Sequence, residues 1–204
     1  MIIHNVEQNS NEWYELRAGI PTASNFNQLI TGTGKPSTSI DKYAEKLAGD
    51  FFAGAPIDAW EGNKYTDRGH EIEPDARNWY EMRTDSEVQQ VGFITDDDKS
   101  TGCSPDGLIS DNGLIEIKCL PKQHIKALLY FNKYKKAPPD YRPQIQGQMM
   151  ITGREWCDLV YYHPELPKII IREYADLDYQ IILTEQITKV ITLRDDIVNV
   201  LKNI

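Results

Sequence analysis

The strongest constraint on the fold is residues 104–119, SPDGLISDNGLIEIKC, where a Pro-Asp-Gly turn and an Asn-Gly reversal precede an alternating strand. Successive side chains of a strand point to opposite faces, so Glu116 and Lys118 project to the same side, about 6.6 Å apart along the strand. The apolar side chains between and beyond them face the other way, into a core. The Asn-Gly pair favours a tight reversal, and we expect residues 87–95 and 114–120 to form a hairpin around it.

The rest of the chain alternates between helical and strand periodicity. Apolar spacing of three and four residues, together with capping signals, predicts helices over residues 11–19, 23–32, 39–52, 62–83, 123–134, 142–153 and 180–204. Apolar runs predict two further strands over residues 158–163 and 168–174. Pro74 is expected to kink or break the fourth helix. Helices, a sheet and more helices predict an α/β (α+β) fold with a central mixed β-sheet flanked by helices.

Composition limits the class of protein. A chain of 204 residues suits one domain, residues 1–204, built on one core. Its formal net charge of −9 argues against coating nucleic acid through the overall field, so DNA binding would need local basic patches. Three cysteines without CxxC spacing, and a start without signal-peptide character, indicate a reducing cytoplasm. The short apolar runs argue against a membrane role.

The Pro-Asp-Gly turn can aim the carboxylate of Asp106 at the volume that Glu116 and Lys118 occupy. Two carboxylates at close range disfavour each other's ionisation, whereas a hard divalent cation such as Mg²⁺ takes both as oxygen ligands. The alternative is an ordinary turn beside a solvated Glu-Lys pair on an exposed strand face. The short spacing and the apolar neighbours on both faces favour the metal site.

At these residues the sequence resembles a known family. Pro105-Asp106, nine intervening residues and then Glu116-x-Lys118 match the PD-(D/E)xK nuclease signature. The wider string CSPDGL…GLIEIKC is similar to the lambda-exonuclease branch of that superfamily, the YqaJ-type viral recombinases. The resemblance implies a restriction-endonuclease-like core and covers most of the chain from residue 12 to about 153. Further segments that fall in the family's order are residues 12–24, 68–77 and 142–153.

The resemblance implies a role for each residue of this site. Asp106 and Glu116 would hold Mg²⁺, two ions per site with Mn²⁺ able to substitute, where the metals clamp the attacking and leaving oxygens of a phosphodiester. The backbone carbonyl of Ile117 and the side chain of Glu73, on the central helix, would supply further ligands. Lys118 would orient the attacking water and offset negative charge on the phosphoryl group.

A glutamine-bearing helix follows the metal motif in this family. The resemblance assigns Gln144 to it, as a catalytic residue that orients the attacking water or a neighbouring group. Gln146 and Gln148 are near enough in the sequence to take that role instead. A merely polar helix face is the alternative for all three.

A pocket for a terminal 5′-phosphate is also implied by the resemblance. Arg17, Ser24 and Ser104 match its positions, which suits a guanidinium fork backed by hydroxyl donors. Such a pocket would separate an exonuclease from an endonuclease. Read without the family, Arg17 could close a helix C-terminus and Ser24 could cap a turn.

Contacts with DNA must come from local charge. Lys122, Lys126 and Arg142 lie in a basic segment interleaved with aromatic residues and are expected to bind backbone phosphates, although a solvated amphipathic helix explains the same charges. Family members use an apolar wedge near the central helix to separate the strands. The matching region here offers only Tyr65 and Thr66, which leaves strand separation without an evident wedge.

The expected function is that of a Mg²⁺-dependent exonuclease. It would start at a double-stranded DNA end, degrade the 5′-terminated strand and leave a 3′ overhang for recombination. The resemblance further implies a homotrimer around the duplex, a single-strand annealing protein as partner, and a phage or prophage origin. One alternative is a structure-specific or restriction-like endonuclease, and the other is a non-catalytic DNA-end-binding module of the same fold.

Overall fold

A computed structural model of the chain describes residues 1–57 and 64–204, and of residues 64–71 it describes only the backbone. The side chains of Tyr65 and Thr66, considered above for strand separation, therefore lie outside the described residues. The elements are β1 (Ile2–His4), α1 (Asn11–Arg17), the 3-10 helix η1 (Ala23–Gln28), α2 (Ile40–Ala53), α3 (Lys64–Thr84), β2 (Val88–Gln89), β3 (Phe93–Thr95), β4 (Gly102–Cys103), β5 (Gly107–Ile109), β6 (Gly113–Lys118), α4 (Pro121–Tyr134), the 3-10 helix η2 (Pro139–Tyr141), α5 (Arg142–Thr152), β7 (Trp156–Tyr161), β8 (Ile169–Tyr174) and α6 (Leu177–Leu201).

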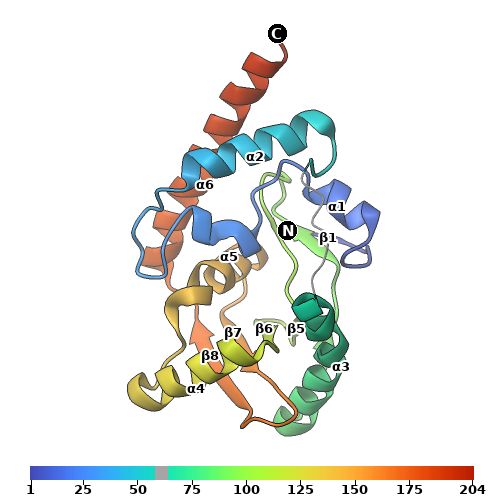
Figure 1. The fold of residues 1–204 in the computed structure, drawn as a ribbon, viewed down its shortest axis with the longest axis vertical. Coiled ribbons are helices and arrows are strands. Elements are labelled where there is room, and N and C mark those ends of the chain that lie inside the picture. The colour runs from blue at the N-terminus through green and yellow to red at the C-terminus, as the bar shows by residue number, and fades with distance from the viewer. Residues whose placement is uncertain (58–63) are drawn as a thin grey trace.

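The described strands form two sheets. The larger is a five-stranded mixed sheet in the order β2-β5-β6-β7-β8, in which only the β6–β7 pair is parallel. The smaller sheet is antiparallel, in the order β1-β3-β4. Helices surround both, and the C-terminal end of α6 projects past α2 (Figure 1). The predicted fold class, a mixed sheet flanked by helices, is confirmed.

The predicted hairpin is wrong in its partner strand. β6 pairs with β5, with Ile115 opposite Gly107, rather than with residues 87–95. Those residues split into β2 and β3, which belong to different sheets. Gly92 lies at the break, where an added Cβ would come within 2.0 Å of the Val6 carbonyl oxygen. The chain passes the N-terminal segment too closely there for a continuous strand with larger side chains.

One helix prediction also needs correction, and a second is narrowed by the structure. Residues 23–32 form only the short helix η1, because their Ser and Asn side chains favour local hydrogen bonds over a regular helix. Asn25, for example, donates to the Thr22 hydroxyl at 3.2 Å. α3 continues through Pro74, so of the predicted kink or break the structure excludes the break, although proline removes one helical hydrogen bond there.

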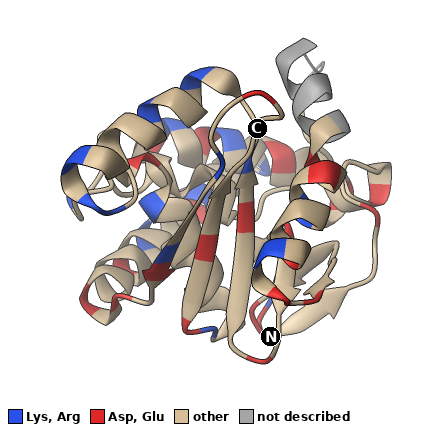
Figure 2. Ribbon diagram, turned by 90° about the horizontal axis from the view of Figure 1, so that it is seen from below, with Lys and Arg blue, Asp and Glu red and all other residues tan. Residues whose placement is uncertain are grey.

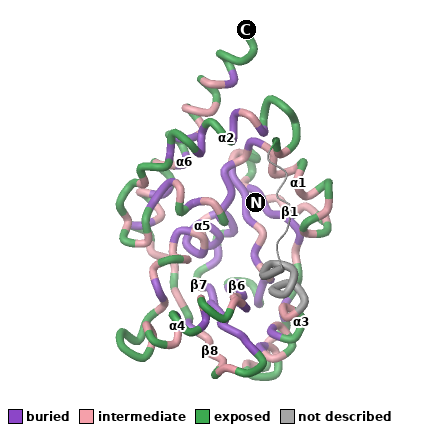
Figure 3. The backbone as a smooth tube through the Cα atoms, viewed as in Figure 1, coloured by how far each residue is buried: buried purple, intermediate pink, exposed green. Residues whose placement is uncertain are grey.

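Both faces of the central sheet are covered, which places charged side chains of β6 inside the protein. Leu114 packs with apolar residues of α2, α5 and α6 on one face. Ile115 and Ile117 pack on the other face against Ala76 and Tyr80 of α3. Figure 3 shows buried residues gathered at the strands and exposed residues along the outer helices. The side chains of Leu114, Glu116 and Lys118 therefore share a covered face.

Charged residues lie along the helices (Figure 2), whereas the thiols are buried. Figure 2 shows Lys and Arg positions interspersed with Asp and Glu positions along the helices in this view. The three cysteines, Cys103, Cys119 and Cys157, are buried free thiols. Within the described ranges, no helix has the length and apolar character needed to cross a membrane.

A buried carboxylate ties α3 to the edge of the sheet. Asp158 on β7, which is 1% exposed, accepts two hydrogen bonds of 2.8 Å from Arg172 and one of 2.6 Å from the Tyr80 hydroxyl. We expect Asp158→Ala to lower the free energy of unfolding by roughly 2–4 kcal/mol, because it leaves both donors without their acceptor. Urea unfolding measures this loss. Asp111→Ala, which changes an exposed loop carboxylate, is the control, and an equal loss in both variants would contradict the assignment.

Candidate active site

The β5–β6 hairpin positions the first carboxylate. Asp106 comes directly before β5, and its Oδ2 accepts a hydrogen bond of 2.5 Å from the backbone N–H of Ile117 on β6. The hairpin is held at its far end by Arg154, whose guanidinium donates to three carbonyl groups. These belong to Ile109, Ser110 and Gly113. The turn therefore points the Asp106 carboxylate across the hairpin at β6, as the Pro-Asp-Gly sequence predicts.

Glu116 lies at the centre of a buried polar cluster. It is 2% exposed, and its Oε1 accepts hydrogen bonds from Lys118 at 2.5 Å and from Gln144 at 2.7 Å. Its Oε2 accepts one from Gln148 at 2.7 Å. The side chain of Lys118 is itself only 16% exposed. The alternative of a solvated Glu-Lys pair on an open strand face is excluded by this burial.

The glutamines of α5 divide by helical face. Gln144 and Gln148, four residues apart, lie on one face and both contact Glu116. Gln146 lies on the other, where its amide donates to the Tyr174 carbonyl at 2.8 Å and accepts from the Asp176 N–H at 2.9 Å. Gln146 thus connects α5 to the start of α6. The spacing of four residues is the signal in the sequence that pairs Gln148 with Gln144.

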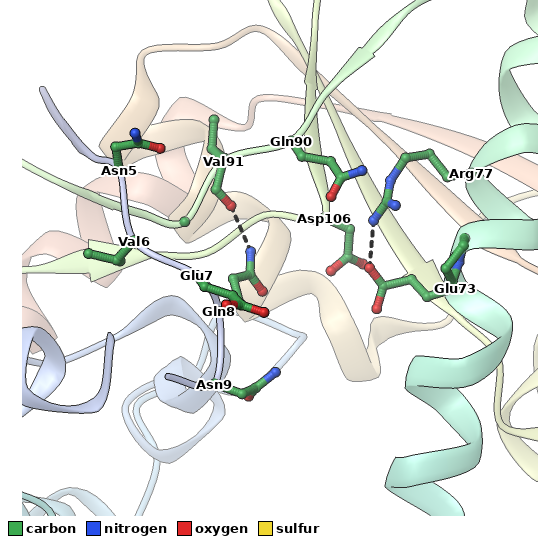
Figure 4. Close-up of a pocket in the computed structure, with 12 residues that line it drawn as sticks. Asn5, Val6, Glu7, Gln8, Asn9, Glu73, Arg77, Gln90, Val91 and Asp106 are labelled. Atoms are coloured by element: carbon green, nitrogen blue, oxygen red, sulfur yellow. Dashed lines mark hydrogen bonds and ion pairs between the residues drawn. The ribbon is translucent and has the colours of Figure 1, made fainter. Parts of the chain in front are cut away.

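Glu73 meets Asp106 across an open cavity of about 510 Å³. Figure 4 shows the two carboxylates directed toward each other, one from α3 and one from the hairpin. Arg77, one helical turn on, donates to Glu73 at 2.7 Å. The opposite wall comes from residues 5–9 and 90–92. Water and small ions can therefore reach the Glu73 and Asp106 carboxylates through this cavity.

The electrostatics of this cluster point to a missing positive charge. Burial raises the pKa of Asp106 well above its ordinary value, and the nearby Glu116 and Glu73 carboxylates raise it further. Burial alone would lower the pKa of Lys118, but Glu116 and Asp106 raise it above its ordinary value, so this side chain stays an ammonium. Lys118 pairs with Glu116 and Arg77 pairs with Glu73, whereas the described hydrogen bonds give Asp106 only the Ile117 N–H. A cation that entered the cavity would relieve the repulsion around Asp106.

The donor set fits a hard divalent cation. Carboxylate oxygens are the ligands that Mg²⁺ prefers, and Asp106, Glu116 and Glu73 supply them from three elements. Among the residues whose side chains are described, no three His, Cys, Asp or Glu groups already form a ligand shell. A bound cation would have to draw Glu116 from its Lys and Gln donors or share its oxygens with them.

A second polar group surrounds Arg17, at the end of α1. Its guanidinium donates to the hydroxyls of Ser24 at 3.2 Å, Thr22 at 3.3 Å and Ser104 at 3.4 Å. It stacks 3.9 Å from the ring centre of Trp13, whose indole N–H donates to Ser104 at 2.9 Å. Burial lowers the pKa of Arg17 to about 10, so the group stays charged at neutral pH. The structure thus brings the three predicted phosphate-pocket residues together and adds Trp13 and Thr22.

Trp13 precedes Arg17 by four residues, and this spacing on a helix is the signal that could have predicted their contact. No carboxylate pairs with Arg17 in the part of the chain that the structure describes. A charged guanidinium with hydroxyl partners and the aromatic rings of Trp13 and Phe93 beside it is suited to an anion.

The three basic residues predicted to contact DNA are not brought to one place. Lys122 and Lys126 lie on the first turns of α4 and line a second cavity. Lys126 also pairs with Asp140 at 2.6 Å, at an exposed position. Arg142, at the start of α5, forms an ion pair with Asp176, the N-cap of α6. Its contact with DNA stays a prediction.

The geometry agrees with what a comparison of sequences finds. The profile described as the YqaJ-like viral recombinase domain matches residues 12–155. The chain belongs to this family. The matched range contains Asp106, Glu116, Lys118 and both contacting glutamines, and the predicted family membership is confirmed. No curated protein sequence matches the chain.

Solved structures extend the family likeness to nearly the whole chain. An alkaline exonuclease from Laribacter hongkongensis is 32% identical, with a TM-score of 0.82 over 95% of this chain and 97% of that one. The same enzyme has been solved in complex with dAMP. A phage-related exonuclease from Haemophilus somnus 129PT is 16% identical, with a TM-score of 0.70 over 89% of this chain and 96% of that one, and shows the shared fold.

Proposed function

We propose that this YqaJ-family protein is a Mg²⁺-dependent exonuclease that degrades the 5′-terminated strand from double-stranded DNA ends and leaves a 3′ overhang for single-strand annealing. The observation that carries the proposal is the convergence of Asp106, Glu116 and Glu73 beside the Lys118 ammonium. The similarity to an alkaline exonuclease at 32% identity supports the reaction class. That enzyme's complex with dAMP, a deoxynucleoside monophosphate, agrees with a product of stepwise strand degradation.

Each residue of the cluster has a chemical task in this reaction. Asp106, Glu116 and Glu73 would hold Mg²⁺, with the Ile117 carbonyl as a further ligand, and the bound metal would polarise the phosphodiester and acidify water. Lys118, fixed by Glu116, would place positive charge where the phosphoryl oxygens gain negative charge. Gln144 and Gln148 would hold Glu116 in position on both of its oxygens.

Polarity would come from the group around Arg17. A terminal 5′-phosphate matches a buried guanidinium with three hydroxyl partners, because charge-assisted hydrogen bonds to Arg are strong and directional. Ser104 is two residues before Asp106, so a phosphate held at Arg17 would place the adjoining phosphodiester near the carboxylates.

We expect Arg17→Ala to erase the preference for 5′-phosphorylated over 5′-hydroxyl ends. The preference should fall from roughly tenfold or more to about one, because the change removes hydrogen bonds to a charged group. Initial rates on two duplexes that differ only in the terminal phosphate measure it. Arg83→Ala, which removes an exposed arginine from α3, is the control and should keep the preference. An Arg17→Ala enzyme that also kept it would refute the 5′-phosphate pocket.

Polarity is tested with linear duplexes that carry one label each, at one 5′ or one 3′ terminus. With Mg²⁺ and purified protein, labelled mononucleotide should be released first from the 5′ terminus. Early release from the 3′ terminus would overturn the proposed direction.

Two other functions would use the same fold. An endonuclease with this metal centre would cut covalently closed plasmid, whereas the proposed exonuclease leaves it intact while it digests the linearised plasmid. A non-catalytic end-binding module would bind duplex ends and release no nucleotide. The presence of Asp106, Glu116 and Lys118 in one buried cluster favours catalysis over mere binding.

The assembly and cellular setting are part of the proposal. The protein would act as a homotrimer around the duplex, pass its overhang to a single-strand annealing protein, and work in the cytoplasm of a bacterial host that carries a phage or prophage. Sedimentation equilibrium with and without duplex DNA tests the trimer, and a monomer in both conditions would exclude it.

A further inference from the structure

A second cavity, of about 360 Å³, opens beside the active site and has no task in the function proposed above. Lys122 and Lys126 of α4 contribute to its lining, together with Tyr161 at the end of β7. Its volume is within the range of about 300–1,000 Å³ that is typical of small-molecule sites. We call it the Tyr161 cavity.

The hydroxyl of Tyr161 is the feature that indicates a ligand. The residue is fully buried, at 0% exposed, and lines the cavity. Its hydroxyl oxygen has no hydrogen-bond partner among the residues that the structure describes. A buried hydroxyl without a partner costs roughly 1–3 kcal/mol, so native proteins rarely keep one unless a ligand or water satisfies it.

The remaining lining suits a flat, polar-edged group with a negative charge. Pro138 and the ring of Tyr141 supply apolar walls, and the ammonium of Lys122 lies on the exposed rim. Lys126 is balanced by Asp140 at 2.6 Å, whereas the described ion pairs include none for Lys122. Net positive charge at the mouth and aromatic walls within match a nucleobase that carries its phosphate outward.

The cavity shares a wall with the catalytic cluster. The Lys118 ammonium lies 4.6 Å from the ring centre of Tyr141, and Tyr141 also lines the cavity. A group that enters the Tyr161 cavity is therefore one aromatic ring away from the lysine that faces Glu116.

We propose that the Tyr161 cavity receives one unstacked nucleotide of the DNA strand held at the active site, with its base at the Tyr161 hydroxyl and its phosphate at Lys122. This rests on the proposed exonuclease function, which brings a DNA end to the neighbouring cluster. The hydroxyl both donates and accepts, so any of the four bases can use it. The cavity therefore serves strand positioning without sequence preference.

The test is a scan of a single abasic site along the 5′-phosphorylated strand of a linear duplex, with binding measured by fluorescence anisotropy in EDTA. At one position from the end, loss of the base should weaken binding to the native protein. There, Tyr161→Phe should weaken binding of intact DNA roughly two- to tenfold and have no further effect on the abasic duplex. Elsewhere the two changes should be independent.

Two further variants keep the test decisive. Lys122→Ala changes an exposed rim residue and should show the same coupling to that one position. Lys133→Ala removes a charge from the same helix outside the cavity lining and should change binding equally at every position, if at all. Thermal melting of Tyr161→Phe should equal or exceed the native value, because the hydroxyl has no described partner to lose.

The outcomes separate the cavity from the reaction. The protein could digest linear duplex with Mg²⁺ and yet show the same binding affinity whichever position is abasic. This result would refute the Tyr161 cavity proposal and leave the exonuclease proposal intact. The cavity would then hold only water. A protein that neither binds nor digests duplex ends would overturn both.

Discussion

Lys118→Met is expected to lower the rate of mononucleotide release from linear duplex by about 10³-fold while the protein stays folded. The ammonium is the only cation within hydrogen-bond distance of Glu116 among the described residues, at 2.5 Å. Removing one group that stabilises charge in the transition state typically costs about 10²–10³ in rate, and loss of water orientation adds to it. Single-turnover quench measurements with saturating Mg²⁺ report the chemical step directly.

The Lys118→Met variant has two controls. Glu116 keeps its hydrogen bonds from Gln144 and Gln148 in the variant, so circular dichroism and thermal melting should show an intact fold. Lys189→Met, on an exposed position of α6, should leave the rate unchanged. A near-native rate in Lys118→Met would mean that the ammonium has only a structural role.

Asp106→Asn is expected to separate stability from function. The amide keeps an oxygen that can accept the Ile117 N–H, but it removes a metal ligand. We expect the rate of nucleotide release to fall by roughly 10³-fold or more, and Mg²⁺ to stop raising the melting temperature, because a ligand stabilises only a fold that binds it. Native protein should gain about 2.7 kcal/mol at a Mg²⁺ concentration 100 times its dissociation constant.

The effect of Asp106→Asn on the free energy of unfolding depends on pH. The folded-state pKa of Asp106 is raised by burial and by Glu116 and Glu73, so its stabilising contribution is complete at low pH and is lost as pH rises through the folded pKa. Metal-free native protein should therefore lose stability over this range relative to Asp106→Asn, which cannot ionise. Urea unfolding in EDTA at pH 4 to 8 measures the difference. Parallel pH profiles of the two proteins would show that the folded-state pKa of Asp106 is not raised.

Local sequence rules predicted the centre of the site well. Strand alternation places Glu116 and Lys118 on one face, and the Pro-Asp-Gly turn places Asp106 across the hairpin, because both depend only on backbone geometry over a few residues. The break at Gly92 could not be predicted in this way. It arises from a close approach to Val6, a contact that only the folded arrangement of distant segments creates.

The surroundings of the site depend on which helical faces meet the sheet. The spacing of Gln144 and Gln148 indicates that they share one helical face. It does not indicate that this face contacts Glu116 and that the face of Gln146 contacts α6. Tyr141 lies in a short 3-10 helix without apolar periodicity, so its place beside Lys118 left no pattern in the sequence. Arg17 is the opposite case. The resemblance to the family predicted that it lies near Ser104, whereas the local sequence alone indicated only a role at a helix end.

The proposed reaction depends on a divalent cation that Asp106 and Glu116 hold beside Lys118. Crystals grown with Mn²⁺ and measured at its absorption edge locate that ion directly by anomalous scattering. We expect a peak roughly 2.0–2.5 Å from carboxylate oxygens of both Asp106 and Glu116. Mn²⁺ bound elsewhere, or no peak at these carboxylates under conditions where the same ion supports DNA digestion in solution, would contradict it.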